Sequence, residues 1–451
     1  MKISILMVLV LGLPFSLGQA MSAEQESGEV DPLTAQKNST EARISAIQAM
    51  LNGLDNNLLD ANTAKERITL LKSELDIILA HIERLSDPVI TPEFVNPLGL
   101  MDIGFNNSNP TWTSDGQNLG FERHNAQSKE IIIADKIGNI LQTVKYKSKE
   151  PDDLGLDLLL PEFSNNSSYN AGLSWSPDNS QFIFMSNGDD SNYDLYLGSV
   201  GNEISTRLTT HDEKDGHADW SPTGNSIAFI SGRSGNANVY LYDTASKIIS
   251  QISDDPLAFL YPQWSPHGDR LAVTLGSNEN HNVIIYENLE GETKNITHRS
   301  LISWKYDDLR PIWSPDGSKI AFYTNYNEQN DSKVWAIAIV DADSHELKTA
   351  EDIIPLIVAT DVIPDVDKGP AWMPDSENIV YVQKNRKRYN PIHLVNINDK
   401  VSKRIVTDTK INHDVSCSAE GIIAFRSQVN QWDQMFVTKL PGTNRKVISN
   451  K

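Results

Sequence analysis

Short apolar runs recur along most of this chain and are separated by polar loops. Residues 227–230, 271–274 and 320–323 are runs of four, rich in β-branched and aromatic side chains. Such runs are too short for helices and are typical of strands. A second run of the same kind follows after a polar loop, for example at residues 239–242. The pattern therefore predicts successive units of antiparallel strands.

A tryptophan and a tight turn open each unit. The turn is best preserved as Trp-Ser-Pro-Asp-Gly, in which proline sets the φ of the second turn position and Asp-Gly tolerates the remaining dihedrals. The spacings between successive units are 44 to 63 residues, close to the period of a four-stranded propeller blade. The seven repeat positions are Trp112, Trp175, Trp220, Trp264, Trp313, Trp372 and, with cysteine in place of tryptophan, Cys417.

One four-stranded sheet cannot bury both of its faces, but several arranged radially can. We therefore expect an all-β, seven-bladed β-propeller over residues 99–451, with its last strand at 446–449. Residues 100–105 could add a closing strand. If the first or last unit is incomplete, the alternative is a six-bladed ring.

At these residues the chain resembles the TolB-like (PD40) propeller repeats, which carry the same turn followed by an apolar strand. The resemblance covers roughly residues 96–449. It implies the propeller fold but no particular activity, because this turn stabilises a blade whether the protein binds, transports or catalyses.

The N-terminus has the pattern of a secretory signal peptide. Lys2 precedes an apolar run at residues 5–11, and the small residues Gly18 and Ala20 predict cleavage after Ala20. We therefore expect a signal peptide at residues 1–20 and a periplasmic or secreted mature protein. The apolar run is too short to span a bilayer, and no later stretch predicts a transmembrane helix.

Residues 21–98 differ in composition from the repeats. We expect a disordered N-terminus at 21–38, a helical hairpin at 39–86 and a proline-containing linker at 87–98. The hairpin needs a partner for its apolar seams, which could be the propeller, a second copy or another protein. Its apolar positions recur at steps of three and four, at Ile44, Ile47, Leu51, Leu54 and Leu58, and then at Ile68, Leu71, Leu75, Ile78, Ile82 and Leu85.

Charge and cysteine content narrow the possible partners. The net charge of −21 and the isoelectric point near 4.8 argue against nucleic-acid binding, which needs clustered cations. The basic run at residues 384–388 is interpreted as a solvated loop. Cys417 is the only cysteine, so the chain forms no internal disulfide.

The loops that enter the tryptophan strands should surround the mouth of the channel. Residues three positions before each repeat position, together with their neighbours, can contact a protein partner or a polar or carbohydrate ligand there. The alternative is a solvated rim around a water-filled channel. We take as candidate binding residues Asp215, His217, Tyr261, Asp308, Arg310, Asp367, His413 and Asp414, with Arg310 as the anion-binding group.

Sequence motifs for catalysis are sparse. There is no Gly-x-Ser-x-Gly elbow, no His-Glu-x-x-His helix and no paired-cysteine zinc site. We therefore expect a binding or scaffolding protein without catalytic residues, metal or cofactor. The alternative is a carbohydrate-active enzyme, of lyase or hydrolase type, that uses the channel mouth. A cluster of three or more histidine or carboxylate side chains, including the pair His217 and His413, would favour that alternative.

Overall fold

The structure is a computed structural model, and the predicted signal peptide at 1–20, N-terminal segment at 21–38 and helical hairpin at 39–86 lie outside the residues that it describes. The predicted last strand at 446–449 and the closing strand at 100–105 fall outside them as well, except for Phe105. The residues described are 89–97, 105–125, 129–144, 170–188, 192–276, 281–287, 292–294, 307–325, 334–343, 355–365, 368–384, 389–429 and 431–441.

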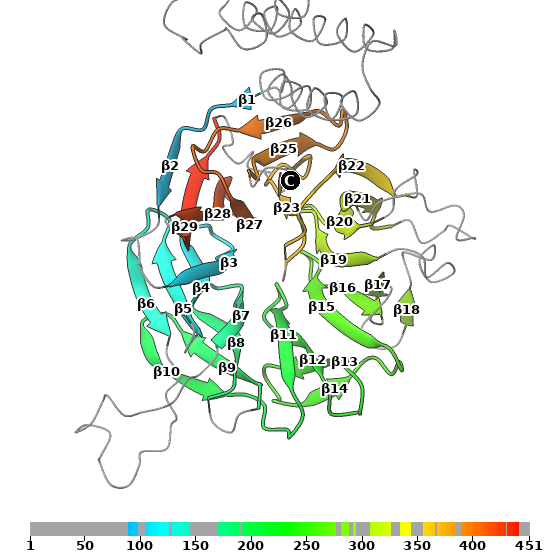
Figure 1. Ribbon diagram of the computed structural model, residues 1–451. Coiled ribbons are helices and arrows are strands. Elements are labelled where there is room, and N and C mark those ends of the chain that lie inside the picture. Colours follow the sequence, from blue (N-terminus) through cyan, green and yellow to red (C-terminus); the bar gives the residue numbers. More distant parts are fainter. Residues whose placement is uncertain are drawn as a thin grey trace, which may run out of the picture. The chain divides into compact units, whose positions relative to one another are not determined.

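The described residues form seven sheets arranged around a central channel, each a blade of a propeller (Figure 1). Blade 1 contains β3 (Asn106–Trp112), β4 (Asn118–His124), β5 (Lys129–Asp135) and β6 (Ile140–Val144). Blade 2 contains β7 (Asn170–Trp175), β8 (Gln181–Ser186), β9 (Asp194–Ser199) and β10 (Asn202–Arg207). Blade 3 contains β11 (Asp215–Trp220), β12 (Ser226–Ser231), β13 (Asn238–Asp243) and β14 (Ile249–Gln251).

The remaining blades continue around the channel. Blade 4 contains β15 (Ala258–Trp264), β16 (Arg270–Gly276), β17 (His281–Glu287) and β18 (Glu292–Lys294). Blade 5 contains β19 (Asp308–Trp313), β20 (Lys319–Thr324), β21 (Ala336–Asp341) and β22 (Leu356–Thr360). Blade 6 contains β23 (Ala371–Trp372), β24 (Asn378–Val382), β25 (Ile392–Asn396) and β26 (Ser402–Ile405), and blade 7 contains β27 (Asn412–Cys417), β28 (Ile422–Val429) and β29 (Trp432–Lys439). The seven-bladed prediction is confirmed, and the six-bladed alternative is wrong.

The N-terminal strands complete the last two blades. β2 (Phe94–Pro97) pairs antiparallel with β29 as the outer strand of blade 7, so the chain closes its ring with a strand from the opposite end. β1 (Val89–Ile90) pairs parallel with β26 as a fifth strand of blade 6. The sequence places residues 89–97 in a linker and the outer strand of blade 7 at 446–449. In the structure β2 takes that position instead, because the backbone N–H and C=O groups along the outer edge of β29 can pair with any extended segment.

The repeated turn is stabilised by its own side chains. In blade 5, the Ser314 hydroxyl donates to Oδ1 of Asp316 at 2.6 Å. The Gly317 amide donates to the Ser314 carbonyl at 2.8 Å, and Gly317 has a φ of 72°, in the left-handed region that favours glycine. The Trp-Ser-Pro-Asp-Gly pattern is therefore explained by local hydrogen bonds and backbone geometry.

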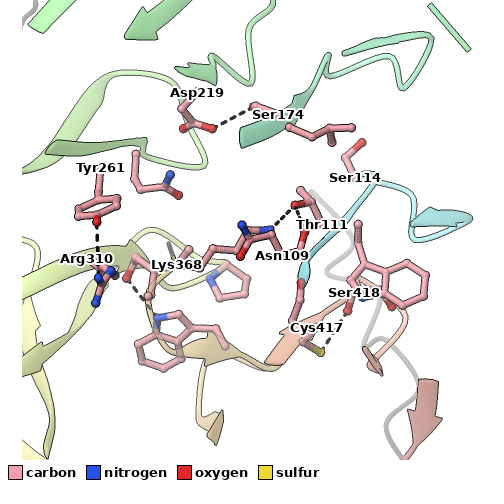
Figure 2. A pocket seen from close by; sticks show the side chains of 18 of the residues that line it. Asn109, Thr111, Ser114, Ser174, Asp219, Tyr261, Arg310, Lys368, Cys417 and Ser418 are labelled. Carbon is pink, nitrogen blue, oxygen red and sulfur yellow. Dashed lines mark hydrogen bonds between the residues drawn. The ribbon is translucent and has the colours of Figure 1, made fainter. Parts of the chain in front are cut away.

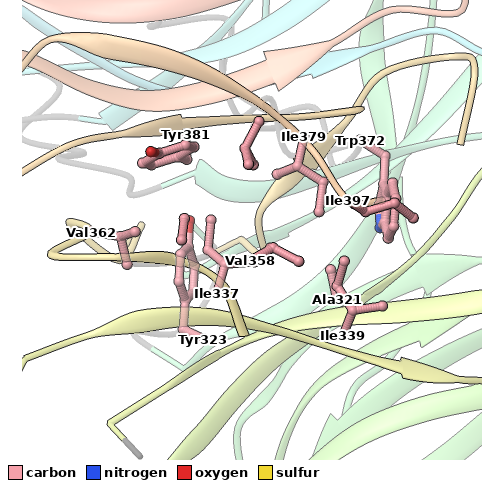
Figure 3. Close-up of a cluster of buried hydrophobic side chains, with 12 residues drawn as sticks. Ala321, Tyr323, Ile337, Ile339, Val358, Val362, Trp372, Ile379, Tyr381 and Ile397 are labelled. Atoms are coloured by element: carbon pink, nitrogen blue, oxygen red, sulfur yellow. The ribbon is translucent and has the colours of Figure 1, made fainter. Parts of the chain in front are cut away.

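The repeat tryptophans join neighbouring blades. The indole N–H of Trp313 donates to the Gln263 carbonyl of blade 4 at 3.0 Å, and that of Trp175 donates to the Thr111 carbonyl of blade 1 at 3.0 Å. Figure 3 shows the apolar cluster between blades 5 and 6, to which Trp372 and Ile379 contribute. The core thus consists of apolar layers between adjacent blades.

Candidate functional site

The inner strands of six blades carry an irregularity at the position that the sequence assigns to the channel mouth. The strand register shifts there, and the residue three positions before the repeat position adopts a left-handed φ of 47° to 67°. This conformation costs a non-glycine residue roughly 1–3 kcal/mol, so the surrounding blade must enforce it. The six residues are Asn109, Gly172, His217, Tyr261, Arg310 and Asp414.

A cavity of about 1220 Å³ lies in the channel. At one end it is lined by the irregular positions of blades 1 to 5, and at the other by residues of the tight turns such as Asp316 and Asp375. Figure 2 shows side chains from several blades pointing into this space. Three of the predicted site residues, His217, Tyr261 and Arg310, line the cavity.

His217, Tyr261 and Arg310 form a continuous row on blades 3, 4 and 5. The His217 and Tyr261 rings meet edge to face, with centroids 4.9 Å apart. The Arg310 guanidinium lies over the Tyr261 ring at 4.9 Å, and its Nη2 donates to the Tyr261 hydroxyl at 3.4 Å (Figure 2). Each side chain limits the rotation of the next, so this row presents ordered polar groups to the cavity.

The predicted residues Asp215 and Asp308 are not among the side chains that line the cavity. Asp215 is fully buried and accepts two hydrogen bonds from Nη2 of Arg233, at 3.0 and 2.9 Å, inside blade 3. Asp308 is also buried, at 2% exposure. Each lies two positions before the irregular residue of its strand, and the register shift at that residue interrupts the alternation of side chains, so both carboxylates face into the blade.

Blade 7 places its two predicted residues away from the cavity. Asp414 is buried and pairs with Arg426 at 2.8 Å. Burial and the nearby Arg426 lower the pKa of His413, so its imidazole is neutral at pH 7. His413 is not among the residues that line the cavity, so the structure does not bring it to His217. Asp367 lies outside the described residues.

Most polar residues that line the cavity are absent from the sequence-based prediction, and Lys368 and Asp219 are two of them. Lys368 directly precedes Gly369, the residue three positions before Trp372 in blade 6, and its side chain reaches blade 1. Its ammonium donates to the Pro110 carbonyl at 2.6 Å and to the Thr111 hydroxyl, the latter contact being visible in Figure 2. Asp219 lies on the inner strand of blade 3, directly before Trp220. Both are within three residues of a predicted position, but the direction in which their side chains point depends on the course of the inner strands.

Asp219 connects three blades. Its carboxylate accepts hydrogen bonds from the Ser174 hydroxyl of blade 2 at 3.1 Å and from the Trp264 amide of blade 4 at 2.8 Å. Burial raises the pKa of Asp219 to about 6, against the opposing effects of these hydrogen bonds and of the Lys368 charge. A carboxyl group whose pKa is raised in the folded state reduces stability once it ionises.

We predict that Asp219→Asn stabilises the protein above pH 6. In the wild type, the loss of folding free energy from ionising Asp219 is absent below the ordinary pKa of 3.8. It develops between pH 4 and 6 and is complete above pH 6. A shift of about two pKa units corresponds to at most roughly 3 kcal/mol. Urea unfolding at pH 4 and pH 7.5 should show an advantage of the variant only at pH 7.5. Asp219→Ala, which removes the acceptors, should be destabilised at both pH values, and an advantage of Asp219→Asn at pH 4 would contradict this assignment.

The described residues contain no group of three His, Cys, Asp or Glu side chains positioned to hold a metal ion. The feature that would favour the enzymatic alternative is therefore not found in the part of the chain that the structure describes. Among the same residues, no helix is long and apolar enough to cross a membrane.

Comparisons with known proteins agree with the fold. Residues 160–354 match the model of the TolB beta propeller domain. No curated protein matches the chain in sequence. Oligogalacturonate lyase from Vibrio parahaemolyticus is similar in structure, with a TM-score of 0.56 and 12% identity over 78% of this chain and 94% of that chain.

Two further solved structures are similar. The β-propeller domain of the Trilobed protease from Pyrococcus furiosus, described as having an open velcro topology, has a TM-score of 0.50 and 13% identity over 75% of this chain and 98% of that chain. TolB from Acinetobacter baumannii has a TM-score of 0.43 and 14% identity over 66% of this chain and 79% of that chain. At these identities the similarities concern the fold.

Proposed function

Because the chain is a TolB-like β-propeller protein, we propose that it is a binding protein of the cell envelope, located in the periplasm. Its site is the end of the channel formed by His217, Tyr261 and Arg310. There it takes a polar ligand or a segment of a partner protein without converting it chemically.

The ordered row of His217, Tyr261 and Arg310 supports this proposal most directly. Its members come from three consecutive blades and contact one another, so they are positioned before any ligand arrives. Preorganised donors reduce the entropy lost on binding. The cavity volume of about 1220 Å³ is sufficient for a small molecule or an extended peptide segment.

Catalysis at this mouth has less support. The likeness to oligogalacturonate lyase is a likeness of fold at 12% identity. Within the described residues, His217 and His413 do not converge and no metal-binding cluster is present. Among the described residues, no observation therefore favours the carbohydrate-active alternative.

The N-terminal segments complete the proposal. The signal peptide at 1–20 would export the chain, and N-terminal sequencing of the mature protein tests cleavage after Ala20. The helical hairpin at 39–86 would serve as a second contact element. Cross-linking from residues on its predicted apolar seams, such as Leu51 or Leu75, would identify what covers them.

We predict that His217→Ala and Arg310→Ala lose the natural ligand while remaining folded. Immobilised protein would be incubated with an envelope extract of the native host, and the retained molecules identified by mass spectrometry. His281→Ala is the matched control, because His281 pairs with Asp307 at 3.1 Å and is not among the residues that line the cavity. The wild type and the control should retain the same molecule, chemically unchanged. Retention by all three variants would place the site elsewhere, and recovery of a cleaved molecule would establish the enzymatic alternative.

A further inference from the structure

We propose that Arg310 binds an anionic group of the ligand, either a carboxylate or a phosphate. This inference rests on the proposed function, since it names the chemical class that the same site accepts. It depends on three features of the structure: the fixed position of Arg310, the lack of a carboxylate partner for it among the described residues, and the distribution of charge along the cavity.

Arg310 is held in position by its backbone and its neighbour. Its amide donates to the hydroxyl of the fully buried Thr274 at 3.1 Å, and its φ is 54°. Its guanidinium is stacked on Tyr261. The backbone of Gly369 lies against the Arg310 carbonyl so closely that a Cβ there would be 2.5 Å from the oxygen. The cation is therefore directed at the cavity by contacts from blades 4 and 6.

Among the described residues, Arg310 has no carboxylate partner, whereas most of the described arginines have one. Arg233 pairs with Asp215, and Arg270 with Asp343, both within 3.0 Å. Among the described residues no carboxylate lies within 4.0 Å of the Arg310 guanidinium, a situation shared with Arg404. The carboxylate-paired arginines of the described segments are Arg123, Arg207, Arg233, Arg270 and Arg426.

Two donors of Arg310 are poorly satisfied. Nε is buried and has no hydrogen-bond partner among the described residues, and the contact of Nη2 with Tyr261 is long at 3.4 Å. A partly desolvated guanidinium has only donors to offer. An anion with two oxygens can satisfy them together, and such charge-assisted pairs are the strongest hydrogen bonds available to the site. The face of Tyr261 is covered by Arg310, so stacking of a neutral ring on that face is disfavoured.

The charges along the cavity also favour an anion at this end. Lys368 lines the same cavity directly before Gly369, and its four-carbon side chain can turn toward an anion. The turn end of the cavity is lined by Asp316, Asp375 and Glu377. Of the two other carboxylates that line it, Glu122 pairs with Lys129 at 2.6 Å, and Asp219 accepts hydrogen bonds from Ser174 and Trp264. In a protein of net charge −21, an anion would thus be repelled from the turns and attracted to the Arg310 end.

The test uses small anions as probes. The wild type would be titrated, at constant ionic strength, with inorganic phosphate and with N-acetyl-Gly-Gly-Ala as the free acid and as the amide. Binding would be measured by calorimetry and by the Nε–H signal of Arg310 in NMR spectra. Arg310→Gln is the test variant. Arg270→Gln is the matched control, because Arg270 is also stacked on an aromatic ring, that of Trp313 at 4.8 Å, but is paired with Asp343 and is not among the residues that line the cavity.

We expect saturable binding of phosphate or of the free acid, but not of the amide. Arg310→Gln should weaken it by about 10- to 100-fold, as for loss of a charge-assisted hydrogen bond, while Arg270→Gln leaves it unchanged. Preference for the free acid over phosphate would assign a carboxylate, and the reverse a phosphate. Equal binding of acid and amide, equal binding by Arg310→Gln, or no binding by the wild type would overturn the proposal. If the natural ligand still requires His217 in that case, the mouth remains the binding site and only the anionic class is wrong.

Discussion

Replacing Trp313 by alanine is expected to lower the free energy of unfolding by about 3 to 5 kcal/mol, the range for removing a buried aromatic side chain. Trp313 is 5% exposed and packs in the apolar cluster between blades 4 and 5. Its loss also leaves the Gln263 carbonyl without the indole donor and removes the ring on which Arg270 stacks. Urea unfolding followed by circular dichroism measures the change.

Two other variants serve as comparisons for the stability of Trp313→Ala. Trp220 is only half-buried, and its indole donates to Gly224 of its own turn at 3.3 Å, so Trp220→Ala should cost less than Trp313→Ala. Arg310→Ala removes a side chain assigned to ligand binding, so thermal stability should change little. If Arg310→Ala unfolds as readily as Trp313→Ala, then Arg310 has a structural role and the assignment of the mouth loses its central residue.

Deleting residues 21–97 is expected to destabilise the propeller strongly, whereas deleting residues 21–88 is expected to leave it intact. The shorter deletion keeps β2, which pairs with β29 over Phe94–Pro97 and closes the ring. The Glu93 amide donates to the Lys439 carbonyl at 2.8 Å, the Thr438 hydroxyl donates to the Phe94 carbonyl at 2.6 Å, and Phe94 packs on the core of blades 7 and 1.

The longer deletion should lower the free energy of unfolding by about 3 kcal/mol, from one partly buried aromatic side chain and several hydrogen bonds. It should also expose the edge of β29, which promotes association. Unfolding midpoints and light scattering of the two deletion proteins measure these effects. Equal midpoints and equal monodispersity would show that β2 does not contribute to closure.

The sequence was most informative where structure is local. The tight turn depends on hydrogen bonds between residues a few positions apart, such as Ser314 and Asp316, so the repeat and its period could be recognised without the fold. In six of the seven blades, the position of the irregularity could also be counted from the repeat position. Three of the eight predicted site residues, His217, Tyr261 and Arg310, therefore line the cavity.

The irregularity in the inner strands limited the rest of the site prediction, because it interrupts the alternation of side chains along the strand. Asp215 lies only two positions before His217, yet it is buried against Arg233, whose approach depends on the packing of blade 3. Asp414 occupies the equivalent position in blade 7, but Arg426 holds its carboxylate away from the cavity. Which side of a strand a residue faces at an irregularity is not encoded by its spacing alone.

The sequence by itself determined the blade, its turn and the number of units, because these depend on short-range backbone geometry and hydrophobic pattern. Only the tertiary structure decided how the ring closes and that Lys368 reaches across the channel. β2 pairs with a strand more than 330 residues away, between Phe94 and Lys439, and Lys368 reaches Pro110 across a separation of 258 residues. Contacts at such separations are selected by the packing of the whole ring.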